Sequence, residues 1–334
     1  MKKKIFAILL FVIITAAGVS CSGTNNNSVA SATPAATPAA TVTPIATVAP
    51  AATATPAETP TETAASETAQ AAESAPINTI ISIGPANSEI LSALGVASKI
   101  IATDSYSVGI PGIQDGLPQF DMMGLDIEQL IKLAPDLIIT TSMLQDGVEA
   151  LKPVEDAGIR VEYVQVANTI QDVENSINFI AGVVGKETQG GQIVAHMNAE
   201  IDKIKAVGDT ITDKKTVYFE LDSFGGYYPV GGGSFLNEMI EIIGAANVFA
   251  DQASWFTASD ETIIAADPDV ILTSENYVDN SVDQIKARSG WDAITAVMNG
   301  DVYYIDANSS SRPSQNIIEA LKEMAAAVYP DYYK

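Results

Sequence analysis

Hydrophobic and polar positions follow two different spacings along the first half of this chain, from residue 77 onward. Short runs of β-branched and other apolar residues predict strands, and apolar residues three or four positions apart predict helices. The expected strands are 78–83, 99–103, 137–141 and 160–166. The expected helices are 88–94, with Ser88 as its N-cap, 127–133 and 148–157. Strands that alternate with helices predict βαβ units and a mostly parallel sheet.

The same alternation restarts in the second half. The expected strands there are 215–221, 270–273 and 302–305, and the expected helices begin near Glu238, near Glu261 and at Asn316. Between the halves, residues 171–207 carry no strand pattern, and Ile193, Met197, Ile201 and Ile204 share one helix face. We therefore expect one long connecting helix of about 20 residues, about 30 Å in length.

An internal repeat links the two halves. Glu128 opens the segment EQLIKLAPDLIIT, and Glu261 opens ETIIAADPDVILT. Each glutamate stands seven residues before a Pro-Asp pair, and an apolar run and a threonine follow in the same frame. A second pair of similar segments is EILSALG, which begins at Glu89, and EMIEIIG, which begins at Glu238. Two related halves predict two similar lobes, with a small-molecule site in the cleft between them.

The first 21 residues have the composition of a secretory signal. Lysines at positions 2–4 precede a short apolar run, and Gly18-Val19-Ser20-Cys21 resembles a bacterial lipobox. The run is shorter than the roughly 20 apolar residues of a membrane-spanning helix. We expect a lipoprotein acylated at Cys21 and held on the extracytoplasmic face of the cell membrane. The alternative is an uncleaved anchor or a chance cysteine.

Residues 22–76 consist mainly of Ala, Thr, Ser and Pro, without Lys, Arg or aromatic residues. This composition predicts a disordered tether. The remainder, 77–334, is the expected two-lobed binding domain, with an N-lobe at 77–167, a connecting helical segment at 168–210 and a C-lobe at 211–334. The formal net charge of −24 argues against nucleic acid as a partner and against a strongly anionic ligand. Because Cys21 is the only cysteine, no disulfide is expected within the chain.

Residues 78–334 resemble the substrate-binding proteins of ABC importers for cobalamin, iron-siderophore complexes and haem, the class III periplasmic binding proteins. The segments that carry the resemblance are IISIGPANSEILSALG (80–95), GLDIEQLIKLAPDLIIT (124–140), NVFAD (247–251), SDETIIAADPDVILT (259–273) and RPSQNIIEALKEMA (312–325). The resemblance implies two Rossmann-like lobes joined by a single long helix. It implies a monomer that captures a metal chelate and delivers it to an ABC permease dimer, with no catalytic residue and no cofactor.

In that family one glutamate at the tip of each lobe docks into arginine pockets of the permease. The matching positions here are Glu128 and Glu261. An alternative needs no partner, since a carboxylate in the first turn of a helix is favoured by the helix dipole.

Ligands of doubly wound lobes lie beyond the carboxyl ends of the strands. The candidate ligand-binding residues at those ends are Asn87, Tyr106, Met122, Met123 and Ser142 in the N-lobe, and Tyr227, Tyr228, Trp255, Tyr277 and Arg312 in the C-lobe. Aromatic faces pack well against flat chelates, although each ring could instead belong to the core or its rim.

Arg312 is nearly the only cation in these loops, and it could equally form a structural ion pair. One arginine does not suit the highly anionic complex of iron with catecholates, so an iron-siderophore of hydroxamate type is the favoured ligand. Cobalamin and haem remain open. Corrinoid binders of the family place a tryptophan just before the Gly of the docking segment, where this chain has Met122 and Met123.

Two other classes of protein are alternatives to a binding protein. A secreted two-lobed hydrolase would need a catalytic group from His196, the only histidine, because Cys21 lies outside the domain. A single histidine also argues against a site for a bare metal ion, since such sites usually draw on several histidines. Gly231-Gly232-Gly233-Ser234 could cradle an anion before a helix, but it lacks the lysine of a P-loop. A surface adhesin lipoprotein would explain the tether but not the paired Glu128 and Glu261.

Overall fold

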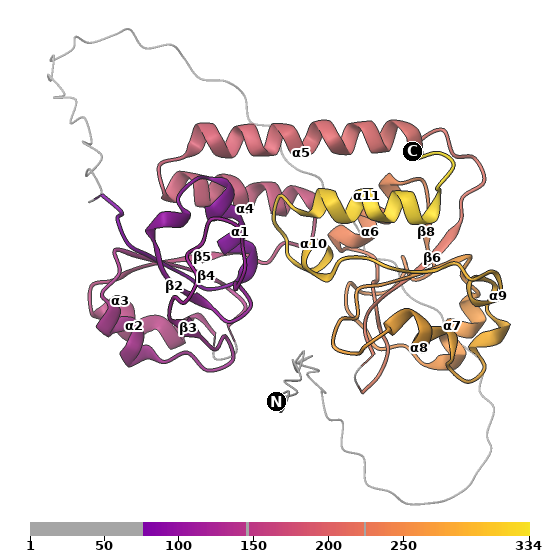
Figure 1. The fold of residues 1–334 in the computed structure, drawn as a ribbon, viewed down its shortest axis with the longest axis horizontal. Coiled ribbons are helices and arrows are strands. Elements are labelled where there is room, and N and C mark those ends of the chain that lie inside the picture. Colours follow the sequence, from indigo (N-terminus) through magenta and orange to yellow (C-terminus); the bar gives the residue numbers. More distant parts are fainter. Residues whose placement is uncertain (1–75, 145–146, 224) are drawn as a thin grey trace, which may run out of the picture. The chain divides into compact units, whose positions relative to one another are not determined.

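The computed structural model describes residues 76–144, 147–223 and 225–334 of the chain (Figure 1). The signal segment, Cys21 and the tether up to residue 75 lie outside the described residues, so the expectations for them stay predictions. Among the described residues, no helix combines the length and the apolar composition that crossing a membrane requires.

The N-lobe is built on a five-stranded sheet in which every pair of neighbours is parallel, with the order β3-β2-β1-β4-β5. Its strands are β1 (Ile80–Ser82), β2 (Ile100–Asp104), β3 (Gln119–Phe120), β4 (Leu137–Thr141) and β5 (Arg160–Val164). Its helices are α1 (Pro85–Ala93), α2 (Ile127–Leu133) and α3 (Lys152–Asp156), with 3₁₀ turns at Ala97–Lys99 and Val148–Leu151.

Alternate strand residues enter different cores, as the twofold period of a strand requires. Ile80 and Ile139 face the large core shared with α1 and with α4 (Ile170–Val183). Ile81 and Ile138 face a smaller core with α2 and α3. Helices therefore cover both faces of this sheet, which is the arrangement that buries a parallel sheet.

The C-lobe sheet has the order β10-β9-β6-β7, and β8 also pairs with β6. Its strands are β6 (Thr216–Asp222), β7 (Tyr228–Pro229), β8 (Ala246–Asn247), β9 (Val270–Thr273) and β10 (Val302–Tyr304). Only β7 runs antiparallel to its neighbour. The helices of this lobe are α6 (Phe235–Ile242), α7 (Asp260–Ala266), α8 (Ser281–Lys286), α9 (Thr295–Asn299), α10 (Ala307–Ser311) and α11 (Ile317–Val328), with a 3₁₀ turn at Trp291–Ala293. The predicted α/β class with mostly parallel sheets is confirmed.

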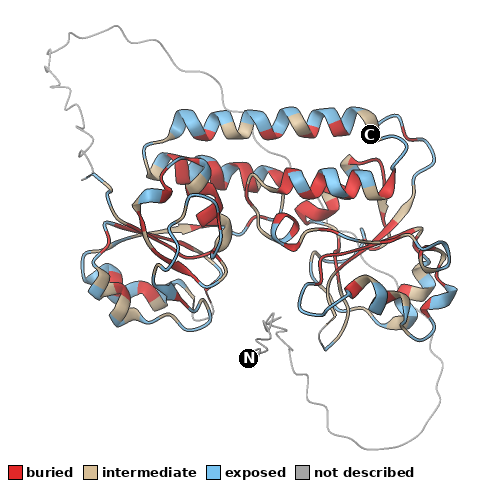
Figure 2. Ribbon diagram, in the orientation of Figure 1, coloured by how far each residue is buried: buried red, intermediate tan, exposed pale blue. Residues whose placement is uncertain are grey.

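A long helix joins the lobes and packs against helices of both. The predicted long helix is α5 (Glu187–Gly208), of 22 residues, and it is preceded by α4 (Ile170–Val183). A capping box between Thr169 and Asp172 starts α4. Gly190 lets α4 and α5 approach closely, because a Cβ there would lie 2.5 Å from the Cβ of Ala181. Figure 2 shows buried residues on the sheets and along α4 and α11, and exposed residues along the outer face of α5.

The internal repeat corresponds to repeated local structure. Asp136 accepts hydrogen bonds from the amide and hydroxyl of Thr79, and Asp269 accepts the same two bonds from Thr216. The aspartates thereby join the starts of β1 and β4 in one lobe and of β6 and β9 in the other. Both preceding helices, α2 and α7, end at a residue in the left-handed conformation, with φ of 45° and 41°.

One predicted helix start is wrong. Helix α1 begins at Pro85, directly after Gly84, whose φ is 106°. Proline suits the first position of a helix because its missing N–H is not needed there. Ser88 is therefore inside the helix rather than at its cap, and its hydroxyl is bonded to the buried hydroxyl of Ser82 at 2.8 Å.

Candidate functional site

Two of the predicted tyrosines, Tyr106 and Tyr277, follow strands of different lobes and are called the tyrosine pair. Tyr106 follows β2 and is half-buried, while Tyr277 follows β9 and is 56% exposed. Burial raises the pKa of Tyr277, and the nearby groups of Tyr106, Asp222 and Glu275 raise it further. Both tyrosines follow the carboxyl end of a strand, the place where the sequence predicts a ligand site.

The turn that carries Tyr106 is organised by a buried carboxylate. Asp104 is fully buried and accepts hydrogen bonds from the Tyr106 amide at 2.8 Å, the Gly84 amide at 3.0 Å and the Ser107 hydroxyl at 2.6 Å. Burial raises the pKa of Tyr106, and the neighbouring Asp121 and Asp104 add to that effect. Negative groups therefore surround this tyrosine on its own lobe.

Arg312 reaches from the C-lobe to the N-lobe. Its Nη1 donates to Oε1 of Glu89 at 2.8 Å, and its Nη2 donates to the carbonyl oxygen of Tyr106 at 3.0 Å. Glu89 is only 6% exposed. The structural ion pair considered from the sequence is therefore present, and the positive charge of Arg312 is offset within the protein.

A second carboxyl group on the C-lobe side is buried beside Asp222. Glu275 is 2% exposed, and its oxygens accept from the amides of Ser223 at 2.9 Å and Tyr277 at 2.8 Å. Burial raises the pKa of Glu275, and a hydrogen bond shared with Asp222 raises it further. Two carboxyl groups can share a hydrogen bond only if one carries the proton. This pair contributes negative charge beside Tyr277.

Tyr227 packs into a cluster that sequence reasoning did not find. Arg288 lies over its ring at 4.5 Å and over Trp291 at 4.4 Å, and it forms two bonds of 2.7 Å to the fully buried Glu220. Burial and a hydrogen bond with Asp260 raise the pKa of Tyr227. The signal in the sequence was Glu220, an acid inside an apolar strand that must have a partner.

Trp255 and Tyr228 border the glycine-rich loop. Trp255 is 45% exposed and forms an isolated β-bridge with Val230, which lies two residues after Tyr228 of β7. The glycines are explained by backbone contact, since a Cβ on Gly231 would lie 1.7 Å from a carbonyl oxygen. The amides of Gly231 and Gly232 donate to the carbonyls of Ser254 and Gln252. These two amides are therefore not available to cradle an anion.

The remaining N-lobe candidates differ in exposure. Asn87 is buried, and its side-chain amide donates to the carbonyl of Ile83 at 2.9 Å. Met122 is half-buried against the smaller core, Ser142 is half-buried, and Met123 is 40% exposed. With Trp255 and Tyr277, Met123 is among the predicted residues that offer apolar surface to a ligand.

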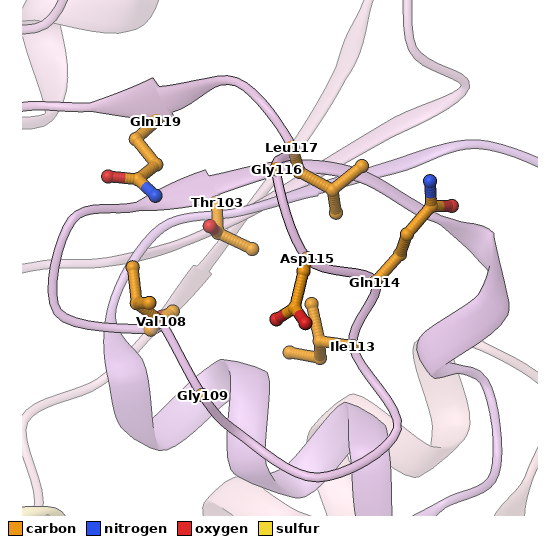
Figure 3. Close-up of a pocket in the computed structure, with 10 residues that line it drawn as sticks. Thr103, Val108, Gly109, Ile113, Gln114, Asp115, Gly116, Leu117 and Gln119 are labelled. Carbon is orange, nitrogen blue, oxygen red and sulfur yellow. The ribbon is translucent and has the colours of Figure 1, made fainter.

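Two surface pockets lie beside loops that follow strands of the described residues. One, of 20 Å³, is enclosed by the loop between β2 and β3, where Figure 3 shows Thr103, Val108, Ile113 and Asp115 around the same space. That volume admits about one water molecule. The other, of 440 Å³, lies beside the loop after β9 and is lined by Glu275, Asn276 and Tyr304 among others. The larger cavity thus adjoins the C-lobe side of the tyrosine pair.

The two repeated glutamates are exposed in the first turns of α2 and α7. Figure 1 shows both helices on the side of their sheets away from α5. Hydrogen bonds from its own amide and from the Ser259 hydroxyl lower the pKa of Glu261. His196 lies exposed on α5.

Known proteins are similar to this chain in sequence and in fold. Residues 80–309 match the family described as periplasmic binding protein. The chain is 32% identical over 261 residues to an uncharacterised ABC transporter substrate-binding lipoprotein of Bacillus subtilis, covering 76% of this chain and 81% of that one. It is 25% identical over 281 residues to a cobalamin-binding protein of Halobacterium salinarum, covering 79% and 73%.

Among solved structures, a possible iron-binding periplasmic protein from Staphylococcus epidermidis matches with a TM-score of 0.68 and 31% identity, over 76% of this chain and 99% of that chain. The family match spans more than half of the present chain and both of its sheets. This chain belongs to the periplasmic binding protein family, as its sequence resemblance predicted.

Proposed function

We propose that this protein captures a ferric chelate of hydroxamate type between its lobes and delivers it to an ABC permease. The observation that carries the proposal is that buried carboxyl groups of Asp104 and Glu275 accept hydrogen bonds from the amides of Tyr106 and Tyr277, while Glu89 pairs with Arg312, the cation of the predicted site. The relatives support the broader role, since one is named as an ABC transporter substrate-binding lipoprotein and a solved structure as a possible iron-binding protein.

The charges around the tyrosine pair select among chelates. Asp104, Asp121, Asp222 and Glu275 lie near the two rings, whereas Arg312 is paired with Glu89. Catecholate groups lose two protons each and leave ferric iron in a strongly anionic complex. Hydroxamate groups lose one proton each and leave an uncharged core, to which a cationic substituent can be added. A neutral or positive chelate therefore avoids the repulsion that an anionic one would meet.

A corrinoid is the second candidate, because one relative is named as a cobalamin-binding protein. The exposed rings of Trp255 and Tyr277 would suit a flat macrocycle. Haem is less compatible with the same surroundings, since its propionates are anionic. Catalysis is not part of the proposal, and neither is a resident cofactor.

The ligand preference can be tested by thermal unfolding of the full-length protein. Ferric hydroxamates, ferric catecholates, cyanocobalamin and haem would each be added in excess. A ligand at 100 times its dissociation constant stabilises the native state by about 2.7 kcal/mol. For a domain of this size we expect a shift of about 5–10 °C with hydroxamates. A shift with catecholates alone would contradict the charge argument, and a shift with cyanocobalamin alone would favour the corrinoid.

Delivery would depend on Glu128 and Glu261, one from each lobe, facing arginines of the permease dimer. Charge-assisted bonds to arginine are among the stronger polar contacts at interfaces. A lipid on Cys21 would keep the protein at the extracytoplasmic face of the membrane, near its permease.

Docking can be separated from ligand binding by charge reversal. Glu128→Lys with Glu261→Lys should abolish uptake by cells and leave ligand affinity unchanged. The matched control is Glu187→Lys with Asp202→Lys, which reverses two exposed acids on α5 and changes the net charge equally. Normal uptake by the docking variant, or a loss of ligand affinity of tenfold or more, would show that the docking assignment is wrong.

A further inference from the structure

Helices α4 and α11 each begin at the boundary between the lobes, and each start is bonded to a glutamate from the other lobe. The amide of Ile170, the first residue of α4, donates to Oε2 of Glu238 on α6 at 2.8 Å. Asn316, the N-cap of α11, donates from its side chain to Oε2 of Glu89 on α1 at 2.9 Å. In Figure 1 both helices run away from this boundary, beneath α5.

The two contacts are reciprocal because the two glutamates occupy matching positions in the two halves of the internal repeat. Glu89 opens EILSALG and Glu238 opens EMIEIIG, and each segment lies on the first helix after the first strand of its lobe. An α1 glutamate from the N-lobe therefore meets a C-lobe helix, and an α6 glutamate from the C-lobe meets an N-lobe helix. Duplication of one lobe accounts for both contacts together.

Electrostatics favours this exchange. The N-terminus of a helix carries a partial positive charge, so two helix starts at one boundary attract carboxylates. Glu89 is nearly completely buried, and it also accepts from the hydroxyl of Ser314 at 2.5 Å and from Arg312. A buried carboxylate with that many donors resists displacement, because moving it would leave an unpaired charge.

The Glu89 contact extends to the ligand site. The arginine that pairs with Glu89 also holds the carbonyl of Tyr106, in the turn after β2. A C-lobe segment thus holds the main chain of Tyr106, a predicted ligand-binding residue of the N-lobe. The contact between the lobes and the placement of Tyr106 depend on the same set of bonds.

We propose that Glu89 and Glu238 are positioning residues that form a reciprocal clamp between the lobes, and that through Arg312 the clamp holds the turn of Tyr106 at the boundary between them. This inference rests on the proposed function in so far as it assigns the clamp a role in ligand binding. The clamp itself is a property of the unliganded protein. The competing view is that both glutamates stabilise only the helix to which they bond.

Lobe separation can be measured by double electron–electron resonance on the full-length chain without ligand. Spin labels would be placed at Lys132→Cys on α2 and Ala265→Cys on α7, both exposed, with Cys21→Ser removing the native thiol. We expect a narrow distance distribution for the parent and a clearly broader one for Glu89→Gln combined with Glu238→Gln. The control Glu241→Gln, an exposed acid on α6 whose bond to Asn237 is local, should leave the distribution narrow. An unchanged distribution in the double variant would overturn the clamp.

Local and functional readouts complete the test. Hydrogen exchange of the Ile170 amide should accelerate in Glu238→Gln and not in Glu241→Gln. Affinity for a ferric hydroxamate should fall by about tenfold in the double variant, equivalent to about 1.4 kcal/mol. If the parent binds none of the chelates, the proposed function fails while the distance measurement still decides the clamp. If broadening occurs with unchanged affinity, the link to the ligand site is refuted.

The donors offer a second route if the glutamate variants do not fold. Asn316→Ala removes the side-chain donor to Glu89, and Ile170→Pro removes the amide donor to Glu238 at a helix position that tolerates proline. Broadening in these variants supports the clamp, and a narrow distribution in both overturns it.

Discussion

Replacement of Arg288 by methionine should destabilise the C-lobe strongly. The arginine is the partner of Glu220, which has no exposed surface, and both of its terminal nitrogens lie 2.7 Å from the carboxylate oxygens. The guanidinium also packs against the rings of Tyr227 and Trp291. Methionine keeps much of the side-chain volume but leaves Glu220 buried without its counter-charge.

The magnitude follows from these contacts. Removing one partner of a buried ion pair costs about 3–5 kcal/mol. Each cation–π contact contributes about 0.5–1 kcal/mol, and part of that energy overlaps with the ion pair. We expect the free energy of unfolding to fall by about 4–6 kcal/mol, and the melting temperature by about 10–20 °C.

Urea unfolding followed by circular dichroism measures this loss. Arg288→Met combined with Glu220→Gln should recover more than half of it, because no charge is then left buried. Arg160→Met is the control, since its pair with Glu162 is partly exposed and should contribute about 1 kcal/mol or less. The prediction is wrong if Arg288→Met lowers the free energy of unfolding no more than the control does. It is also wrong if the double replacement lowers it by the sum of the two single replacements.

Three further outcomes are expected. Hydrogen bonds from the amides before β1 lower the pKa of Asp136 from 3.8, so Asp136→Asn should reduce the free energy of unfolding at pH 7. The difference between the variant and the parent should vanish as pH falls through the lowered pKa. Equal losses in urea unfolding at pH 7 and pH 3 would contradict this expectation. Gly231→Ala should lower the free energy of unfolding by about 1–3 kcal/mol, because the added Cβ would meet the Ala253 carbonyl oxygen. Gly124→Ala is the control, since open space surrounds Gly124 and its thermal unfolding should be unchanged. Cys21→Ala should release the protein from membranes or leave it as precursor in cell fractionation, and a correctly cleaved variant retained on membranes would contradict the lipid anchor.

The order of strands and helices could be predicted where patterns are local and repeated. Helix α2 and strands β4 and β9 begin and end at the predicted residues, because the repeat supplies two copies of the same apolar run and the same Pro-Asp stop. Strands β3, β7 and β8 were missed, since each has two residues and no period can be read from two. Helix α4 was not separated from the connecting segment.

The pairings of the buried acids could not be predicted from the sequence. The carboxyl-end rule nominates Tyr106 and Tyr277 as ligand residues, and that nomination stays a prediction. The partners of Glu89 and Glu220 lie 223 and 68 residues away along the chain, and only the folded structure brings such residues together. Arg312 was for that reason considered as a ligand contact, although its guanidinium is bonded to Glu89 and Tyr106.

We propose that this periplasmic binding protein holds a neutral or positively charged ferric chelate. Titration calorimetry of the full-length protein with ferrioxamine, a positively charged ferric hydroxamate, measures this binding. We expect a single site with a dissociation constant of about 1 μM or lower, corresponding to a binding free energy of about −8.2 kcal/mol or a more favourable value. Absence of binding to ferrioxamine, together with binding of a ferric catecholate under the same conditions, would contradict it.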